Sequence, residues 1–393
     1  ELRRGGIADR LAGLSGSQLT TGHLPTIYHL ARSLDAGVID ATRWILLAKD
    51  YLRFRLTGNV GTELCDATGT HLVAMPADDW SDALCSLLAL PRDRLPAIHR
   101  SGEIAGYVTA GAAEATGLRA GTPVVYGGGD SHCALLGLGV TGSGEAGLLL
   151  GTNSTLRASF AGLVRPLAQT VWIQQHVVPG RFTASASPMA GSSALTWFKA
   201  ACCPDLPAGP AAFAALESLA AGVAPGCDGL LFHPYLFGER SPFYNPEARG
   251  AFLGLRHWHG RGHLARGVME GVALAIGNCL DALRAIARTR DEELRVLRTG
   301  QSGGSRLPLW RQIIADALEQ AIEVVAVDEP GCLGAALLAG LGTGWYENLS
   351  AAVERTVRVT ARVQPDARTA ALYRERREIF NNVYEALEER LYR

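Results

Sequence analysis

Short apolar segments beside glycines alternate with longer helical segments along this chain, and the alternation limits the folds open to it. The apolar segments have the length and setting of buried strands, and they cover residues 122–127, 147–151, 229–233, 294–297 and 322–327. Apolar side chains recur at helical spacing over residues 263–287, 308–321 and 372–391. The pattern predicts an α/β protein, with residues 202–213 as a loop between domains or subdomains.

The composition is that of a soluble globular protein. The chain has 393 residues, of which 48% are hydrophobic and 19% are charged, and this length suggests two or three domains. A formal net charge of -1 argues against nucleic-acid binding, and no apolar run is long enough to span a bilayer. The eight cysteines include no CxxC pair, which favours reduced thiols in a cytoplasmic protein.

The many glycine-rich turns raise the question of phosphate binding. A P-loop needs a lysine directly after a glycine, and neither of the two lysines, Lys49 and Lys199, follows one. Residues 137–142, GLGVTG, match the glycine pattern of a dinucleotide-binding turn. The residues after them resemble a turn and a strand, whereas that turn should open a helix. We therefore predict neither a P-loop nor a dinucleotide-binding turn in this chain.

Three other glycine turns are candidates for ligand contact. Residues 148–155, LLLGTNST, predict a β-hairpin whose turn is either an anion site or an ordinary connection. Residues 302–305, SGGS, follow a strand and precede a helix, either as a ligand contact or as a plain loop. Residues 329–340 add a glycine-rich helix entry after a strand.

A group of three histidines stands before the helix predicted over residues 263–287. His257, His259 and His263 lie in the glycine-rich stretch RHWHGRGH. Metal binding requires ligands that converge in a defined geometry, whereas this composition favours a solvated turn. We therefore predict no metal ligand from the protein.

Asp130 directly follows three glycines, residues 127–129. Three successive glycines indicate an unusual backbone or a close approach by another group. Asp130 fits two roles. It caps a helix that begins near Ser131, or it is a general base at the end of a strand, where the glycines admit a substrate. This stretch alone does not separate the two.

Seven motifs in order make the whole chain resemble the FGGY family of carbohydrate kinases, most closely its xylulokinases. The matching segments are residues 49–58, 61–70, 127–130, 148–154, 234–255, 302–316 and 331–340. The segment from Gly250 to Glu270 resembles the C-terminal signature of the family and departs from it at Gly267, where Ala or Ser is expected.

The resemblance implies a two-domain α/β fold of the actin/hexokinase/Hsp70 type, which is ribonuclease H-like, with a central cleft. It implies that Asp130 is the catalytic base, which takes a proton from a sugar hydroxyl as that oxygen attacks the γ-phosphate of ATP, and that Ser131 helps to bind the sugar. Mg²⁺ would bridge the phosphates. The nucleotide-binding residues implied are Gly151, Thr152, Asn153, Gly254, Gly303, Gly304, Ser305 and Gly331.

The resemblance also implies domain limits. Residues 1–122 would be the remainder of the sugar-binding N-terminal domain. Residues 123–365 would be the nucleotide-binding C-terminal domain, with Asp130 at the junction, and residues 366–393 a C-terminal helix. Family members open with a phosphate-handling hairpin, and nothing like it precedes Leu14-Ser15-Gly16. The first domain is therefore expected to be incomplete.

The implied function is ATP-dependent phosphorylation of D-xylulose to D-xylulose 5-phosphate. Gluconate, glycerol or another polyol is the alternative acceptor, because Ser131 and His132 stand where xylulokinases usually place Asn after the aspartate. A non-catalytic nucleotide- or sugar-binding remnant and an Hsp70-like ATPase are alternative functions. The expected partners are the sugar and ATP, with no nucleic acid and no membrane, and a homodimer is left open.

Overall fold

The computed structural model describes residues 2, 6–15, 19–165, 167 and 170–392. Gly16 and the outer limits of the predicted domains, Glu1 and Arg393, lie outside the described residues. The chain forms two compact units. Unit 1 comprises residues 1–143, 159–184 and 330–357, and unit 2 comprises residues 144–158, 185–329 and 358–393. The predicted domain limits stay predictions. Within the described ranges, no helix is both long and apolar enough to cross a lipid bilayer.

Unit 2 is built on a mixed sheet whose strand order is β13-β12-β11-β5-β6. β11 runs parallel to β5 and to β12, and β13 is antiparallel to β12. A separate antiparallel pair is formed by β9 and β10. Each strand segment predicted in this unit overlaps a strand. The bounds are β5 (Glu145–Leu150), β6 (Ser154–Ala161, which enters unit 1 at Ser159), β9 (Leu231–His233), β10 (Ala251–Leu253), β11 (Val296–Thr299), β12 (Ile322–Val325) and β13 (Val359–Val363).

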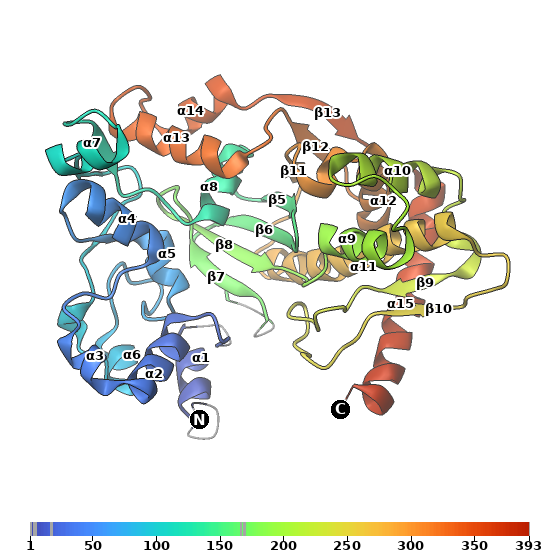
Figure 1. Ribbon diagram of the computed structural model, residues 1–393, viewed down its shortest axis with the longest axis horizontal. Helices are drawn as coiled ribbons and strands as arrows, with labels where there is room; N and C mark the ends of the chain where they lie inside the picture. Colours follow the sequence, from blue (N-terminus) through green and yellow to red (C-terminus); the bar gives the residue numbers. More distant parts are fainter. Residues whose placement is uncertain (1, 3–5, 16–18, 166, 168–169, 393) are drawn as a thin grey trace. The chain divides into compact units, whose positions relative to one another are not determined.

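The helices of unit 2 gather around the long helix α11, against which α10 and α12 pack (Figure 1). Trp310 of α12 is fully buried, and its Nε1–H donates to the carbonyl of Met269 in α11 at 3.0 Å. α12 ends three residues before its predicted limit because Glu319 adopts a left-handed φ of 51°. The bounds are α9 (Ser192–Cys202), α10 (Pro210–Ala221), α11 (Arg261–Arg288), α12 (Pro308–Leu318), α15 (Ala367–Leu391), and the 3₁₀ turns η2 (Cys227–Gly229) and η3 (Gly303–Arg306).

One connection in unit 2 differs from the sequence prediction. Residues 203–209 join α9 to α10, so the loop expected over residues 202–213 is shorter and does not link the two units. The rest of that stretch opens α10 with Pro210 in the first turn, where the missing N–H of proline costs no hydrogen bond.

Unit 1 combines short helices with the strand pairs β1–β2 and β3–β4. It also contains the last residues of β6, which pair with β8, and β8 in turn pairs with β7. One apolar core surrounds Leu11, Leu72 and Leu84, and a second surrounds Leu136 and Leu338. The helices are α1 (Ile7–Ser15), α2 (Leu24–Leu34), α3 (Ala36–Ala41), α4 (Ala48–Thr57), α5 (Leu64–Gly69), α6 (Asp82–Leu87), α7 (Ala110–Thr116), α8 (Asp130–Gly137), α13 (Pro330–Gly342), α14 (Leu349–Thr356) and the 3₁₀ turn η1 (Arg92–Arg94). The strands are β1 (Thr62–Glu63), β2 (Ile98–His99), β3 (Ile104–Tyr107), β4 (Pro123–Val125), β7 (Trp172–Gln175) and β8 (Arg181–Ala186).

Helices α8 and α13 lie side by side in unit 1 and touch through their backbones (Figure 1). A Cβ atom built on Gly334 would lie 1.8 Å from the carbonyl oxygen of Cys133, and one built on Gly137 would lie 1.9 Å from that of Pro330. Only glycine permits this approach, because real Cβ atoms do not come so close to another heavy atom. The contact therefore fixes α8, and with it Asp130, which is the first residue of α8.

Two neighbouring imidazoles, of the buried His71 and the half-buried His23, lie beside the other core of unit 1. His71 adopts a left-handed φ of 62°, and its ring centroid lies 4.0 Å from that of His23. Its Nδ1 is 3.0 Å from Ser15 Oγ, and its Nε2 is 3.2 Å from Nε2 of His23. Burial and then the neighbouring His23 lower the pKa of His71 to about 3, so the ring is neutral when the protein is folded near pH 7.

The depressed pKa of His71 makes folding sensitive to acid. Between the unfolded value of 6.5 and about 3, only the unfolded chain protonates this ring, so the free energy of unfolding falls as pH falls, by up to about 1.4 kcal/mol per pH unit. His71→Asn, which tolerates the left-handed φ, should flatten this dependence. Urea unfolding at pH 7.5 and pH 5.0 measures it, and an equal pH dependence in the wild type and the variant would contradict the prediction.

Candidate functional site

The loop of three glycines before Asp130 has no room for a side chain at its second and third positions, Gly128 and Gly129. Gly127 has a left-handed φ of 78°. A Cβ built on Gly128 would lie 2.7 Å from Val177 Cγ1, and one built on Gly129 would lie 2.6 Å from Asp66 Oδ1. The loop is thus pressed against α5 and the β7–β8 connection, which explains the run of glycines in the sequence.

Asp130 is exposed at the start of α8, with Gly129 in the N-cap position. Of the two roles considered from the sequence, Asp130 does not occupy the capping position. Its Oδ1 accepts the N–H of Ser131 at 2.5 Å, and a carboxylate in the first turn of a helix is favoured by the helix dipole. Next to it, Ser131 is half-buried, while His132 is buried with its Nε2 3.4 Å from Thr183 Oγ1. An accessible carboxylate is what proton abstraction from a hydroxyl requires.

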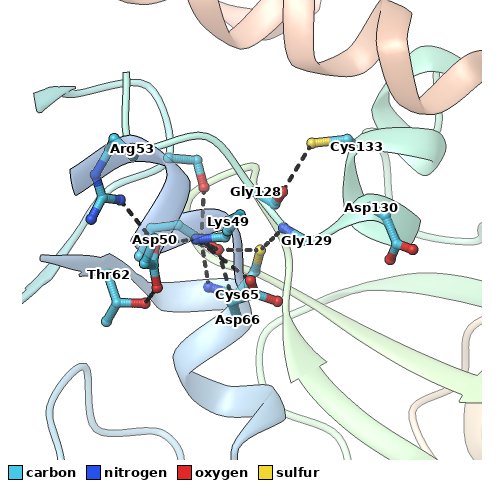
Figure 2. A network of polar contacts seen from close by, with 12 residues as sticks. Lys49, Asp50, Arg53, Thr62, Cys65, Asp66, Gly128, Gly129, Asp130 and Cys133 are labelled. Atoms are coloured by element: carbon cyan, nitrogen blue, oxygen red, sulfur yellow. Dashed lines mark hydrogen bonds and ion pairs between the residues drawn. The ribbon is translucent and has the colours of Figure 1, made fainter. Parts of the chain in front are cut away.

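A buried charge cluster lies on one side of this loop, and the carboxylate of Asp130 points away from it (Figure 2). The cluster centres on Lys49 at the start of α4. Its Nζ lies 2.7 Å from Asp50 Oδ1, 3.4 Å from Glu63 Oε1 and 3.5 Å from Asp66 Oδ2. Asp50 also accepts a hydrogen bond from Arg53 at 2.9 Å. No role was predicted for these residues from the sequence, although the two segments that contain them, residues 49–58 and 61–70, are among the seven motifs that resemble the FGGY family.

The charges in the cluster alter one another's protonation. Burial alone would lower the pKa of Lys49, but the carboxylates of Glu63, Asp50 and Asp66 outweigh it and raise that pKa above its usual value. Burial raises the pKa of Asp66 to about 6, with Lys49 opposing the rise and the other two carboxylates adding to it. Lys49 is therefore a firmly charged centre that holds acidic groups from α4, β1 and α5 together.

Unit 2 contains a cavity of about 540 Å³ beside the turn between β5 and β6. Among the residues predicted to bind nucleotide, Gly151, Thr152 and Gly303 line it. The other lining residues were not predicted from the sequence. Most lie on α9, which no periodic pattern indicated, and one lies in the 234–255 segment: Ser192, Ser193, Thr196, Trp197, Ala200 and Phe237.

The start of α9 is tied to the β5–β6 turn by backbone contacts. The N–H groups of Ser192 and Ser193 donate to the carbonyls of Gly151 at 2.8 Å and Thr152 at 3.1 Å. A Cβ on Gly191 would lie 2.6 Å from the carbonyl carbon of Asn153. These contacts bring Gly151 and Thr152, two of the three residues predicted for phosphate binding, to the cavity, and Ser193 and Thr196 of α9 line it with them. Asn153 is not among the lining residues.

The SGGS turn reaches the same cavity through Gly303. This residue has a left-handed φ of 55°, and a Cβ there would lie 2.3 Å from the carbonyl oxygen of Leu150. Gly304 lies behind it, with its N–H donating to Ser192 Oγ at 2.9 Å. Ser305 is buried, and its hydroxyl is 2.8 Å from that of Thr299. Gly303 is therefore the residue of this turn that a ligand in the cavity would touch.

Gly254 and Gly331, two more of the predicted nucleotide residues, are not among the residues that line the cavity. Gly254 follows β10 with a left-handed φ of 76° against the carbonyl of Gly229. Gly331 belongs to unit 1, where a Cβ on it would lie 3.6 Å from the carbonyl oxygen of Asp130.

The histidine turn before α11 is held by its own side chains. The N–H of Gly260 donates to Nδ1 of His263 at 3.2 Å, and the rings of His259 and His263 stack at 4.9 Å. Across the described ranges, no group of three His, Cys, Asp or Glu residues is placed to hold a metal ion.

Comparison with known proteins assigns the chain to a family. Residues 1–137 match the N-terminal domain and residues 140–343 the C-terminal domain of the FGGY family of carbohydrate kinases. The chain is 34% identical to xylulose kinase of Escherichia coli K12 over 87% of its own length and 68% of that protein. It is 32% identical to xylulose kinase of Klebsiella pneumoniae over 95% of its length and 76% of that protein.

A solved structure gives the same assignment. Xylulose kinase from Rhodospirillum rubrum superposes with a TM-score of 0.88 at 28% identity, over 100% of this chain and 78% of that one. The chain therefore belongs to the FGGY family. It is a carbohydrate kinase, a phosphotransferase that uses an alcohol group as acceptor, with the α/β fold of that family. The family and fold class predicted from the motifs are confirmed.

Proposed function

We propose that the protein transfers the γ-phosphoryl group of ATP to a hydroxyl of D-xylulose, giving D-xylulose 5-phosphate, with Asp130 as the general base. The observation that carries the proposal is the accessible carboxylate of Asp130 at the start of α8, on a loop stripped of side chains. That arrangement leaves room for a sugar hydroxyl within hydrogen-bond distance of the carboxylate. Ser131, the next residue, is the proposed neighbouring contact to the sugar.

In the proposed reaction, the hydroxyl oxygen of the sugar bonds to the γ-phosphorus while the bond from that phosphorus to the β-bridging oxygen breaks. Asp130 takes the hydroxyl proton. The protein's contribution is mainly the placement of the acceptor and of the charge that accepts the proton, because phosphoryl transfer needs little covalent help. ATP brings Mg²⁺ as part of the substrate, since this ion binds chiefly through phosphates.

The cavity of unit 2 supports the proposed role of ATP as donor. The turn residues Gly151 and Thr152 and the hydroxyl of Thr196 suit a phosphate chain. Trp197 provides a flat wall for a base, and its ring stacks on Phe232 at 6.0 Å with an interplanar angle of 13°. Asn153, Gly254, Gly304, Ser305 and Gly331 are proposed as further nucleotide contacts on the resemblance alone.

The choice of D-xylulose is supported by the names of the relatives above, all of them xylulose kinases. Sugar-dependent release of ADP tests it across D-xylulose, gluconate and glycerol, and D-xylulose should give the highest kcat/KM. Turnover with gluconate or glycerol and none with D-xylulose would contradict the substrate. ATP hydrolysis indifferent to sugar would favour an ATPase, and nucleotide binding without turnover a non-catalytic protein.

Asp130→Asn tests the proposed base. The amide keeps the shape of the side chain but cannot take the proton, so kcat should fall by about 10²- to 10⁴-fold while affinity for ATP stays within about two-fold. Steady-state kinetics and nucleotide titration measure the two effects. Asp93→Asn, an exposed aspartate of unit 1 in η1, is the control and should keep wild-type turnover. Wild-type kcat in Asp130→Asn would overturn the assignment.

A further inference from the structure

Glu63 is a fully buried carboxylate whose two oxygens are both satisfied. Oε1 accepts the N–H of Asp66 at 3.0 Å and lies 3.4 Å from Lys49 Nζ. Oε2 accepts the N–H of Cys65 at 2.8 Å and the hydroxyl of Ser101 at 3.1 Å. Glu63 thereby caps the start of α5 and joins it to Lys49 of α4. A buried charge with this many partners holds one geometry, because any shift leaves a charge unpaired.

The thiol of Cys65 continues this network to the loop that carries Asp130 (Figure 2). Its Sγ–H donates to Glu63 Oε1 at 3.1 Å, and its Sγ accepts the N–H of Gly129 at 3.4 Å. Cys65 is fully buried, and Gly129 is buried as well. A polar path therefore runs from Lys49 through Glu63 and Cys65 to the backbone directly before Asp130.

We propose that Cys65 is a positioning residue for Asp130, because its thiol ties the Lys49–Glu63 pair to the N–H of Gly129. This inference rests on the proposed role of Asp130. The thiol touches no reacting atom. It acts by fixing the residue that precedes the base, and phosphoryl transfer is sensitive to displacements of an ångström or less.

Two further observations support this role. Burial, and then the nearby Glu63, raises the pKa of the Cys65 thiol well above its usual value, so the S–H stays available as a donor to Glu63. From the other side, Cys133 of α8 donates its Sγ–H to the carbonyl of Gly128 at 3.5 Å. Two thiols on two helices thus hold the one peptide group that joins Gly128 to Gly129, Cys133 through its carbonyl and Cys65 through its N–H.

The decisive comparison is Cys65→Ala with Cys65→Ser in the full chain. Alanine removes both hydrogen bonds, whereas the serine hydroxyl can donate to Glu63 and accept from Gly129. We expect kcat with the best sugar of the panel to fall about 10-fold in Cys65→Ala, with KM for ATP within about two-fold of wild type. Cys65→Ser should restore kcat to within about three-fold of wild type.

Controls separate positioning from loss of stability. Cys85→Ala removes another buried thiol of unit 1, in α6 and in a different apolar core, and should keep wild-type kcat. If Cys65→Ala does not accumulate in folded form, the isosteric pair Cys65→Thr and Cys65→Val replaces it, with Thr the faster enzyme. Wild-type kcat in Cys65→Ala, or equal losses in both members of either pair, would overturn the proposal.

The same assays distinguish failure of this inference from failure of the proposed function. Loss of turnover in Asp130→Asn with wild-type kcat in Cys65→Ala would leave Asp130 as the base and remove Cys65 from its support. Wild-type turnover in Asp130→Asn would overturn both.

Discussion

The backbone contact between α8 and α13 is the constraint on which the rest of the site depends. Gly334 lies against the carbonyl of Cys133, and Gly137 lies against that of Pro330, at separations that exclude any Cβ. On its other side, the loop before α8 presses Gly128 and Gly129 against neighbouring side chains. Glycines thus allow close contacts at both ends of α8. These contacts hold the helix in place, and Asp130 is its first residue.

Each unit contributes a separate half of the proposed chemistry. Unit 1 supplies a carboxylate at a helix start, with the half-buried Lys49 and the buried Glu63 behind its loop. Unit 2 supplies a cavity in which a glycine turn, helix hydroxyls and Trp197 meet. A kinase that phosphorylates an alcohol requires a group that accepts the hydroxyl proton and a pocket that binds the phosphates and the base of ATP. Membership of the FGGY family accords with both halves.

The sequence predicted β5, β11 and β12 of the sheet and the long helices α11, α12 and α15, because apolar spacing reports them directly, but it did not predict β7, β8 or β13. It also singled out Asp130, Gly151 and Gly303, since glycine runs mark close approaches. The sequence did not indicate that α9 lines the cavity. Nothing in the pattern around Thr196 and Trp197 marks them as ligand contacts, and only the fold places them beside Gly151 and Thr152. The contacts among Lys49, Glu63 and Cys65 could not be predicted from the sequence either. They form only when the start of α4 packs against the start of α5.

The most direct test of this account is the kcat of Gly334→Ala. The new methyl group would meet the carbonyl of Cys133 at 1.8 Å, so α8 has to move although the change touches neither Asp130 nor a proposed ligand contact. For folded protein, we expect kcat to fall about 100-fold, with wild-type kcat in Gly111→Ala of α7, where no heavy atom lies within 4 Å. Wild-type kcat in Gly334→Ala would contradict the claim that this packing positions the base.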